Sequence, residues 1–241
     1  MIEGAPALIG VDGCRAGWVG ATYDGAAVRI ALYDSFGVMI DALAGERAAL
    51  CMVDMPIGLP ERDNRACDAA NRAALPGGAS SVFSAPLRCL LEEETYESAC
   101  ALSREHHRRG LAISKQSWFL FPKIREVDAV ARDARYGHVL FRETHPELVF
   151  RDWSGGEKLS SKKTAEGLSA RRALAATLSP NVLHAVDAFI AGTKRKDVAI
   201  DDIYDALACL RVAARVESGD ARAVLATPER DAFGLEMNVW F

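Results

Sequence analysis

The chain opens with short apolar runs separated by turn residues. Residues 7–11, 18–23 and 28–33 each have the length and composition of a strand, and Asp24-Gly25 separates the last two. Asp-Gly between two strand-like runs is a hairpin signal, because a tight turn needs positive φ at both central positions. The pattern therefore predicts an antiparallel meander at the start of the fold.

A helix and a buried strand follow this meander. Ser35 is suited to cap a helix, because its side chain can accept hydrogen bonds from the free N–H groups of a first turn. The apolar residues within 36–43 recur at helical spacing, and residues 48–53 form an apolar run of strand length that ends at Asp54. This order predicts an α/β fold whose mixed sheet has three antiparallel strands, then parallel strands, and is flanked by helices.

A long segment without a strand pattern, residues 57–136, comes next. It is rich in proline and glycine at first and becomes helical at about residues 95–109. A connection of about 80 residues is too long for a simple crossover between strands. We therefore expect an inserted, mostly helical lobe within a single domain that covers residues 1–241. Residues 139–142 then predict a further strand, which ends at Glu143.

The remaining pattern is mostly helical. Apolar residues recur at helical spacing over residues 164–178 and 181–190, and most strongly over 201–217. Residues 235–241 have the composition of a strand, but the pattern does not place this strand in the sheet.

Length and composition are those of one globular domain. The 241 residues are 50% hydrophobic and 26% charged. The six cysteines are scattered without a CxxC pair, and the start lacks a basic stretch followed by a long apolar run, so we expect reduced thiols and a cytoplasmic protein. No run approaches the roughly 20 apolar residues of a spanning helix, which predicts a soluble protein.

The charge balance bears on possible partners. A formal net charge of -4 argues against a protein that coats nucleic acid through a global positive field, but it does not exclude a local site. Basic residues bunch at 104–109, 158–163 and 194–196. Each bunch is also typical of an ordinary solvated surface.

Two aspartates directly follow predicted strands. Asp12 ends the first strand and Asp54 ends the run at 48–53. If these strands are parallel neighbours, about 4.8 Å apart, both carboxylates emerge at the same end of the sheet. Two carboxylates that close repel each other unless a cation or a proton lies between them. Alternatively, each aspartate only initiates a turn, with Gly13 and Pro56 as turn partners.

Two more acids begin the strongest predicted helix. Asp202 and Asp205 fall on the same face as its small apolar residues, which is the face expected to pack on the sheet. Buried carboxylates without partners cost several kcal/mol each, so this pair needs a metal, a basic partner or the helix N-terminus. Asp201 could serve as an N-cap, but capping explains only one acid.

Four carboxylates from two strand ends and one helix are suitable ligands for Mg²⁺ or Mn²⁺. Both ions prefer hard oxygen donors and an incomplete cage that leaves room for water and phosphate. Two such ions about 4 Å apart can activate a water and stabilise the leaving oxygen in phosphodiester cleavage. Zinc is disfavoured, because the five histidines form no HExxH motif and no cysteine cluster supplies soft ligands.

These residues also resemble known families. Residues 8–18 resemble the first strand of RuvC-type Holliday-junction resolvases, and Asp202-Ile-Tyr-Asp-Ala-Leu-Ala resembles their closing helix. Over nearly its whole length the chain is more specifically similar to a bacterial and archaeal family of unknown function, described as predicted ribonuclease H-like nucleases. The matching stretches are residues 10–18, 54–60, 80–86, 116–118, 122–128, 143–147 and 202–206.

The resemblance implies a ribonuclease H-like fold, which opens with three strands, a helix and a strand. It further implies that Asp12, Asp54, Asp202 and Asp205 are metal ligands, with Asp12 bridging both ions. In the resolvases the second-strand acid is a glutamate, so the shorter Asp54 changes how ions are held. A resolvase-like function would also need a homodimer. The nuclease description of the family is itself an inference from fold.

Four further residues are candidates around this centre. Glu143 could be another ligand or a base, with His145 nearby to shuttle a proton, or it could be a polar strand end pinned by Pro146. Ser81 lies in a loop flanked by proline and glycine that could bind an anion through its backbone and select the substrate. Arg15 could reach a phosphate or pair with a carboxylate.

Lys123 is the remaining candidate for a phosphate contact. It follows Trp118 and Phe119, which could offer a stacking surface or, as large aromatics usually do, belong to the core.

Three functions are compatible with these residues. The first is a two-metal phosphodiesterase, a nuclease acting on DNA or RNA. The second is an ATPase of the actin and sugar-kinase class, but that class needs a duplicated fold and a glycine-rich adenosine site, for which the chain has no room. The third is a non-catalytic protein whose carboxylates hold a structural ion or a small phosphorylated ligand, which the acidic balance favours.

Overall fold

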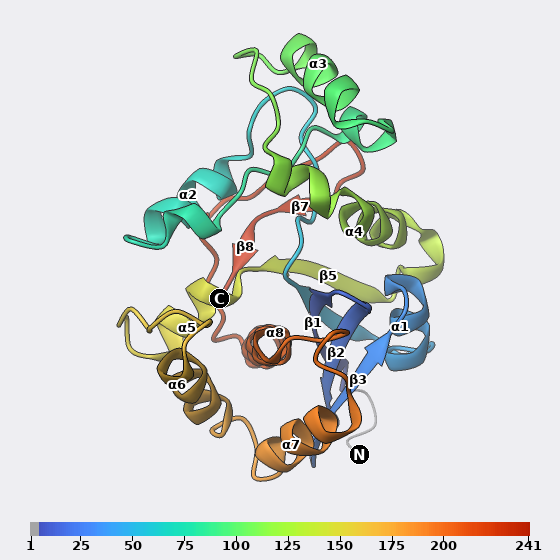
Figure 1. The fold of residues 1–241 in the computed structure, drawn as a ribbon. Coiled ribbons are helices and arrows are strands. Elements are labelled where there is room, and N and C mark those ends of the chain that lie inside the picture. The colour runs from blue at the N-terminus through green and yellow to red at the C-terminus, as the bar shows by residue number, and fades with distance from the viewer. Residues whose placement is uncertain (1–4) are drawn as a thin grey trace.

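The computed structural model describes residues 5–241. Its centre is a six-stranded sheet in the order β3-β2-β1-β4-β5-β8 (Figure 1). β1, β2 and β3 are antiparallel neighbours, whereas β1, β4, β5 and β8 run parallel. The predicted mixed sheet is therefore confirmed. The strands are β1 (Ala7–Cys14), β2 (Gly17–Tyr23), β3 (Val28–Tyr33), β4 (Ala49–Val53), β5 (Val139–Thr144) and β8 (Val239–Trp240).

The turn between β2 and β3 differs from the tight turn that the sequence predicts. Gly25 has a φ of 86°, but no non-glycine residue among the described ones has a positive φ, so Asp24 does not adopt the second left-handed position. The Asp24 carboxylate instead accepts hydrogen bonds from the N–H groups of Ala26 (3.0 Å) and Ala27 (2.9 Å). The side chain of Asp24 thus stabilises a loop at the place where a tight turn, held by backbone hydrogen bonds alone, was predicted.

Helices cover both faces of the sheet (Figure 1). α1 and α4 lie on one face, while α8, α5, α6 and α7 lie on the other. The three helices expected in the second half of the chain are present. The bounds are α1 (Phe36–Leu43), α2 (Ala66–Ala74), α3 (Tyr96–His106), α4 (Lys115–Arg132), α5 (Pro146–Trp153), α6 (Ala165–Ala175), α7 (Val182–Gly192) and α8 (Ile200–Ser218).

The segment expected as an inserted lobe contains α2, α3 and α4. α4 buries Phe121, Ile124 and Val127 in the same core as α1 and the sheet, so this helix belongs to the central layers. Phe119, in contrast, is 75% exposed, so its assignment to the core was wrong. Its place on α4 points it away from the sheet, whereas Trp118 packs against the core.

Alternation along the strands produces two separate cores. Ile9 and Val11 of β1, like Val53 of β4, pack on the α1 and α4 side. Leu8 of β1 and Met52 of β4 pack on the α8 side. Because side chains alternate between the two faces of a strand, this pattern fixes the side to which every later residue of each strand points.

The end of the chain completes the sheet. The expected strand at 235–241 divides into β7 (Glu236–Met237), which pairs with β6 (Glu229–Arg230), and β8, which extends the main sheet beside β5. The side chain of Asn238, between β7 and β8, bonds both backbone groups of Leu225.

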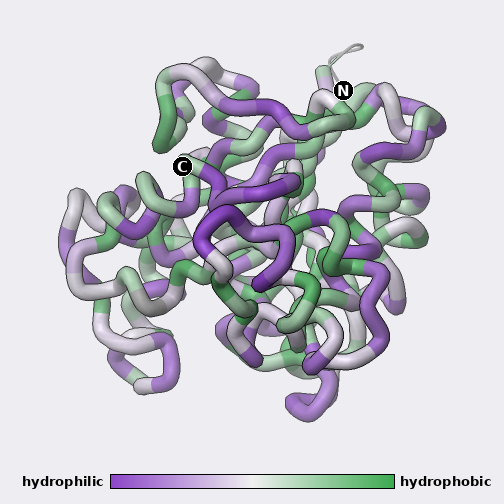
Figure 2. The backbone as a smooth tube through the Cα atoms, turned by 90° about the horizontal axis from the view of Figure 1, so that it is seen from above, coloured by the Kyte–Doolittle hydropathy of each residue, from purple (hydrophilic) through white to green (hydrophobic). Residues whose placement is uncertain are grey.

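Hydrophilic and hydrophobic stretches alternate along the helices (Figure 2), as amphipathic elements that cover a sheet require. No helix within residues 5–241 is both long and apolar enough to cross a membrane. All six cysteines lie in the described residues and are free thiols.

Candidate functional site

The ends of β1 and β4 bring Asp12 and Asp54 together. Val11 and Val53 are register partners in the parallel pair, and the Asp54 N–H donates to the Val11 carbonyl at 3.1 Å. Val11 points to the α4 side, so Asp12, the next residue of β1, points to the α8 side. Asp54 follows the last residue of β4, and its charge acts on Asp12. The expectation that these two strands are parallel neighbours is confirmed.

Helix α8 brings a third carboxylate to this place because it lies directly on β1. A Cβ on Gly10 would lie 2.1 Å from the backbone N of Leu210 and 2.3 Å from the carbonyl of Ala206, so only glycine permits this approach. Asp205 precedes Ala206 on the same helix and is 1% exposed. The inward direction expected for Asp205 is therefore confirmed.

Asp202 lies one helical turn before Asp205 and also bonds the backbone at the start of α8. α8 begins at Ile200, and the Asp202 carboxylate accepts a hydrogen bond from the Ala199 N–H at 2.9 Å. The N-cap residue is Ala199, and the side chain of Asp202, three residues on, completes the cap from inside the helix. We call Asp12, Asp54, Asp202 and Asp205 the carboxylate centre.

The carboxylate centre is short of positive charge. Burial raises the pKa of Asp12 well above its ordinary value, and the charges of Asp205, Asp54 and Asp202 raise it further. Burial likewise raises the pKa of Asp54 and of Asp205 to about 7. Asp205 Oδ1 is buried without a hydrogen-bond partner in the described structure. Each observation indicates a place for a cation or a proton.

Lys162 supplies part of the missing charge. Its Nζ lies 2.6 Å from Asp205 Oδ2 and 3.4 Å from Asp201 Oδ2. Burial alone would lower the pKa of Lys162, but the contact with Asp205 outweighs burial and the pKa is raised. Sequence reasoning did not identify this residue, because it counted Lys162 only as part of the basic bunch at 158–163.

Glu143 is the second-last residue of β5, the strand next to β4. It is the register partner of Val53 and so faces the α4 side. Its carboxylate receives two hydrogen bonds from the Arg65 guanidinium, at 2.6 and 2.9 Å, and one from the Ile57 N–H at 2.9 Å. Glu143 thus pairs with Arg65, and it also lines the small cavity that contains Asp54 and His145.

His145 and Ser81 lie side by side. His145 lines a small cavity together with Asp54, its Nδ1 is buried without a partner, and its Nε2 lies 3.4 Å from the Ser81 carbonyl. Burial lowers the pKa of His145, which favours the neutral ring. The Ser81 hydroxyl donates to the Gly78 carbonyl at 2.7 Å, so the contact with His145 comes from the backbone of Ser81.

The two cations predicted to contact phosphate are held by backbone carbonyls. Lys123 Nζ donates to the Gly17 carbonyl at 2.6 Å and lies 4.4 Å from the centre of the Trp18 ring. The stem of Lys123 packs against Gly13, directly beside Asp12. Arg15 donates to the Lys196 carbonyl at 2.9 Å and is exposed.

The donor set suits a hard divalent cation. Within residues 5–241, no group of three or more His, Cys, Asp or Glu side chains is arranged to hold a metal ion as it stands. The ammonium of Lys162 lies against Asp205 Oδ2, while Asp205 Oδ1 has no hydrogen-bond partner in the described structure. The oxygen ligands therefore fit Mg²⁺ or Mn²⁺ if the Lys162 side chain moves aside.

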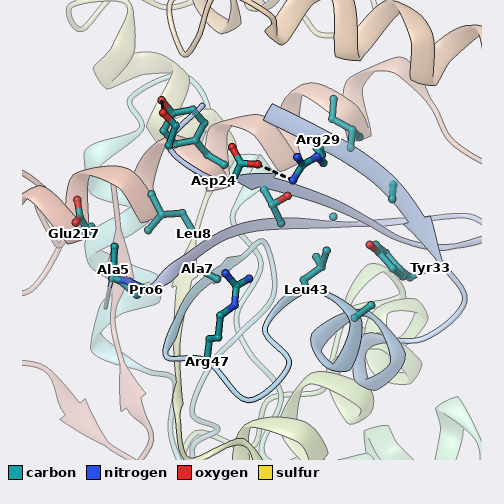
Figure 3. Close-up of a pocket in the computed structure, with 17 residues that line it drawn as sticks. Ala5, Pro6, Ala7, Leu8, Asp24, Arg29, Tyr33, Leu43, Arg47 and Glu217 are labelled. Atoms are coloured by element: carbon teal, nitrogen blue, oxygen red, sulfur yellow. Dashed lines mark hydrogen bonds and ion pairs between the residues drawn. The ribbon is translucent and has the colours of Figure 1, made fainter. Parts of the chain in front are cut away.

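A second cavity is separate from this centre. It measures about 630 Å³ and lies at the opposite end of β1, where Ala7, Leu8, Tyr33, Leu43 and Arg47 line it (Figure 3). None of its lining residues belongs to the carboxylate centre. Substrate reaching Asp12 and Asp205 would therefore not use it.

Fold and site together define a mixed α/β protein with carboxylates gathered where parallel strands end. The chain belongs to the family described as "Protein of unknown function (DUF429)", which matches residues 10–230. The matched range includes every candidate residue of the site. No curated protein and no solved structure matches the chain significantly.

Proposed function

We propose that this protein is a Mg²⁺- or Mn²⁺-dependent phosphodiesterase that cleaves nucleic acid. The observation that carries the proposal is the convergence of Asp12, Asp54 and Asp205, with one Asp205 oxygen buried and unpartnered. A protein rarely buries so many acids in one place unless a cation completes the site.

The topology supports the same proposal. The sheet begins with three antiparallel strands and continues with the parallel strands β4 and β5. Acids lie at β1, at the end of β4 and on the helix that packs on β1. This arrangement is the one expected of a ribonuclease H-like nuclease. Fold alone does not define the substrate, so the proposal rests on the carboxylates and uses the topology as support.

The residues have distinct roles in this proposal. Asp12, Asp54 and Asp205 would hold the cations, while Asp202 combines a ligand role with its helix cap. A divalent cation supplies Lewis-acid activation of water and stabilises the leaving oxygen. Lys162 would leave Asp205 and offer its charge to a phosphate oxygen.

His145 is suited to accept a proton. If its Nε2–H faces the Ser81 carbonyl, its unpartnered Nδ1 carries the free lone pair, and His145 lines the same small cavity as Asp54. The lowered pKa keeps the ring neutral at pH 7, as a general base requires.

The experiment is a cleavage assay with Mn²⁺ against single-stranded, duplex, hybrid and branched DNA and RNA. Asp12→Asn and Asp205→Asn should abolish cleavage. Asp220→Asn, an exposed acid past the other end of α8, should leave it unchanged. Cleavage that persists in both active-site variants would contradict the proposal.

One observation favours a second function. The ion pair between Lys162 and Asp205 already compensates part of the charge, so the site could bind a small phosphorylated molecule without cleaving it. Stabilisation by inorganic phosphate or a mononucleotide, with no cleavage of any polymer, would favour this function over the first.

A further inference from the structure

A cavity of about 340 Å³ lies between three segments that are distant in the sequence. The loop of residues 82–87 forms one wall, the end of α3 with Ser103 and His107 forms another, and the start of α4 with Ser117 closes it. We call it the Ser117 cavity. Its volume falls in the range of small-molecule sites.

Two stretches that are distant in the sequence meet here. Residues 82–86 line one part of the cavity, and Gln116 and Ser117 line another. No residue of the carboxylate centre lines this cavity.

The cavity has an unused buried polar group. Ser117 is 4% exposed, and its hydroxyl has no hydrogen-bond partner in the described structure. The other buried polar side chains are occupied: the Ser103 hydroxyl donates to the Leu111 carbonyl at 2.6 Å, and His107 Nδ1 accepts from the Arg109 N–H at 3.1 Å. A buried hydroxyl without a partner is costly unless a ligand or water satisfies it.

The lining defines the chemistry of the ligand. It contains no Lys, Arg, Asp or Glu, so it offers no lysine or arginine to balance the charge of a phosphate. Phe83 and Leu111 offer apolar surface, and the amides of Asn64 and Gln116 can both donate and accept hydrogen bonds. These properties suit a flat, uncharged group with donors and acceptors on its edge.

The Ser117 cavity also adjoins the carboxylate centre. Val82 and Phe83 line it and also line the small cavity that contains Asp54 and His145. Only Val82 and Phe83 would therefore separate a ligand in the Ser117 cavity from the small cavity beside the proposed site of cleavage.

We propose that the Ser117 cavity binds a nucleobase of a polynucleotide, held by stacking on Phe83 and by a hydrogen bond to the Ser117 hydroxyl. This inference rests on the proposed function, because it names the part of the nucleic acid that is recognised beside the scissile phosphate. It makes the cavity the place where the enzyme distinguishes one base from another.

The test is calorimetric titration of the full chain with the four ribonucleosides, with trinucleotides and with inorganic phosphate. At least one nucleoside should bind, its trinucleotide should bind more tightly, and phosphate should not compete with the nucleoside. Ser117→Ala should weaken nucleoside binding roughly three- to tenfold, the effect of one lost hydrogen bond.

Matched variants keep the result interpretable. Phe83→Ala should also weaken binding, while Phe83→Tyr should preserve it, because both rings can stack. Ser98→Ala, on α3 outside the lining, should bind like the unaltered protein. Failure of all nucleosides and trinucleotides to bind, or unchanged binding in both Ser117→Ala and Phe83→Ala, would overturn the inference. Equal affinity for nucleoside and trinucleotide would overturn its assignment to a polynucleotide.

The outcome can be separated from that of the proposed function. Asp205→Asn should bind nucleosides normally, because no acid lines the Ser117 cavity. Nucleoside binding without any cleavage would support the base pocket and contradict the proposed nuclease activity. If Phe83→Ala cleaves with the same base preference as the unaltered protein, the base pocket is contradicted and the proposed nuclease activity is supported.

Discussion

Lys162 neutralises part of the charge at the carboxylate centre. Its ammonium pairs with Asp205, whose other oxygen has no partner, and its side chain is about one-third exposed. A lysine in this position can hold the acidic site together before a cation binds and can leave through the solvent side when one does. On the proposed function, the same contact would make Lys162 a competitor of the cation.

Replacing Lys162 by methionine should therefore have two opposite effects. Without divalent ions, Lys162→Met should lose roughly 1–2 kcal/mol of stability, less than a fully buried pair would because the lysine is partly exposed. With Mg²⁺, its melting temperature should rise more than that of the unaltered protein, since no ammonium competes. Thermal unfolding with and without Mg²⁺ measures both.

Lys163→Met is the control, because Lys163 is exposed and adjacent. It should leave both melting temperatures unchanged. A Mg²⁺ effect that is no larger in Lys162→Met than in the unaltered protein would contradict the role of Lys162.

The raised pKa values also predict how stability depends on pH. Burial raises the pKa of Asp54 and Asp205 from 3.8 to about 7, so the folded protein binds protons more tightly than the unfolded chain does. The stability that this contributes is fully present below pH 3.8 and is lost as the pH rises through about 7.

Without divalent ions, the contribution of these groups to the free energy of unfolding in urea should therefore fall as the pH rises from 3.8 to about 7. Asp205→Asn should reduce that slope. Added Mg²⁺ should reverse the trend, because deprotonated carboxylates bind the ion. A slope that is identical in Asp205→Asn and the unaltered protein would show that Asp205 does not titrate in this range.

Sequence reasoning named all four residues of the carboxylate centre but not their partners. Asp12 and Asp54 were visible because each follows an apolar run, and Asp205 because it shares a face with small residues. Lys162 and Arg65 were not, because nothing in their local pattern indicates which distant acid each will meet. The same ambiguity made Glu143 a candidate, although its strand position directs it to Arg65.

At the scale of elements, the contact between α8 and β1 positions the site. Gly10 allows the backbone of the helix to touch the strand, and the small residues of α8 line that contact. The carboxylates of Asp12 and Asp205 are brought together only because these two elements lie so close.

Gly10→Ala should therefore destabilise the protein by about 1–3 kcal/mol or more, because the added Cβ meets backbone atoms that cannot rotate away. Gly192→Ala is the matched control. It lies at the end of α7 with open space around it, so it should be neutral or stabilise by up to about 1 kcal/mol. Urea unfolding compares them, and equal stabilities would contradict the close packing of α8 on β1.

Elements whose apolar residues recur with a clear helical or strand period were predictable from the sequence. Elements whose sequence combines features of different structures were not. The meander and α8 have strong patterns. α4 contains Pro122, which reads as a helix breaker, yet its buried residues keep the helix in place through tertiary packing. β7 and β8 are only two residues each, too short for a period to show.

At the scale of the whole molecule, two neighbouring sites share one wall. The carboxylate centre gathers charge at the ends of β1 and β4, and the uncharged Ser117 cavity lies on the far side of Val82 and Phe83. We propose that one site takes a phosphate with its cations and the other takes a base. On this proposal, a chain with a net charge of -4 would act on nucleic acid through a local site.

The central claim is that the carboxylate centre binds a divalent cation, and calorimetric titration with Mn²⁺ tests it most directly. The account predicts that the unaltered protein and Asp220→Asn bind Mn²⁺, and that Asp12→Asn and Asp205→Asn, checked for folding by circular dichroism, do not. Absence of binding in the unaltered protein, or equal binding in folded Asp12→Asn and Asp205→Asn, would contradict it.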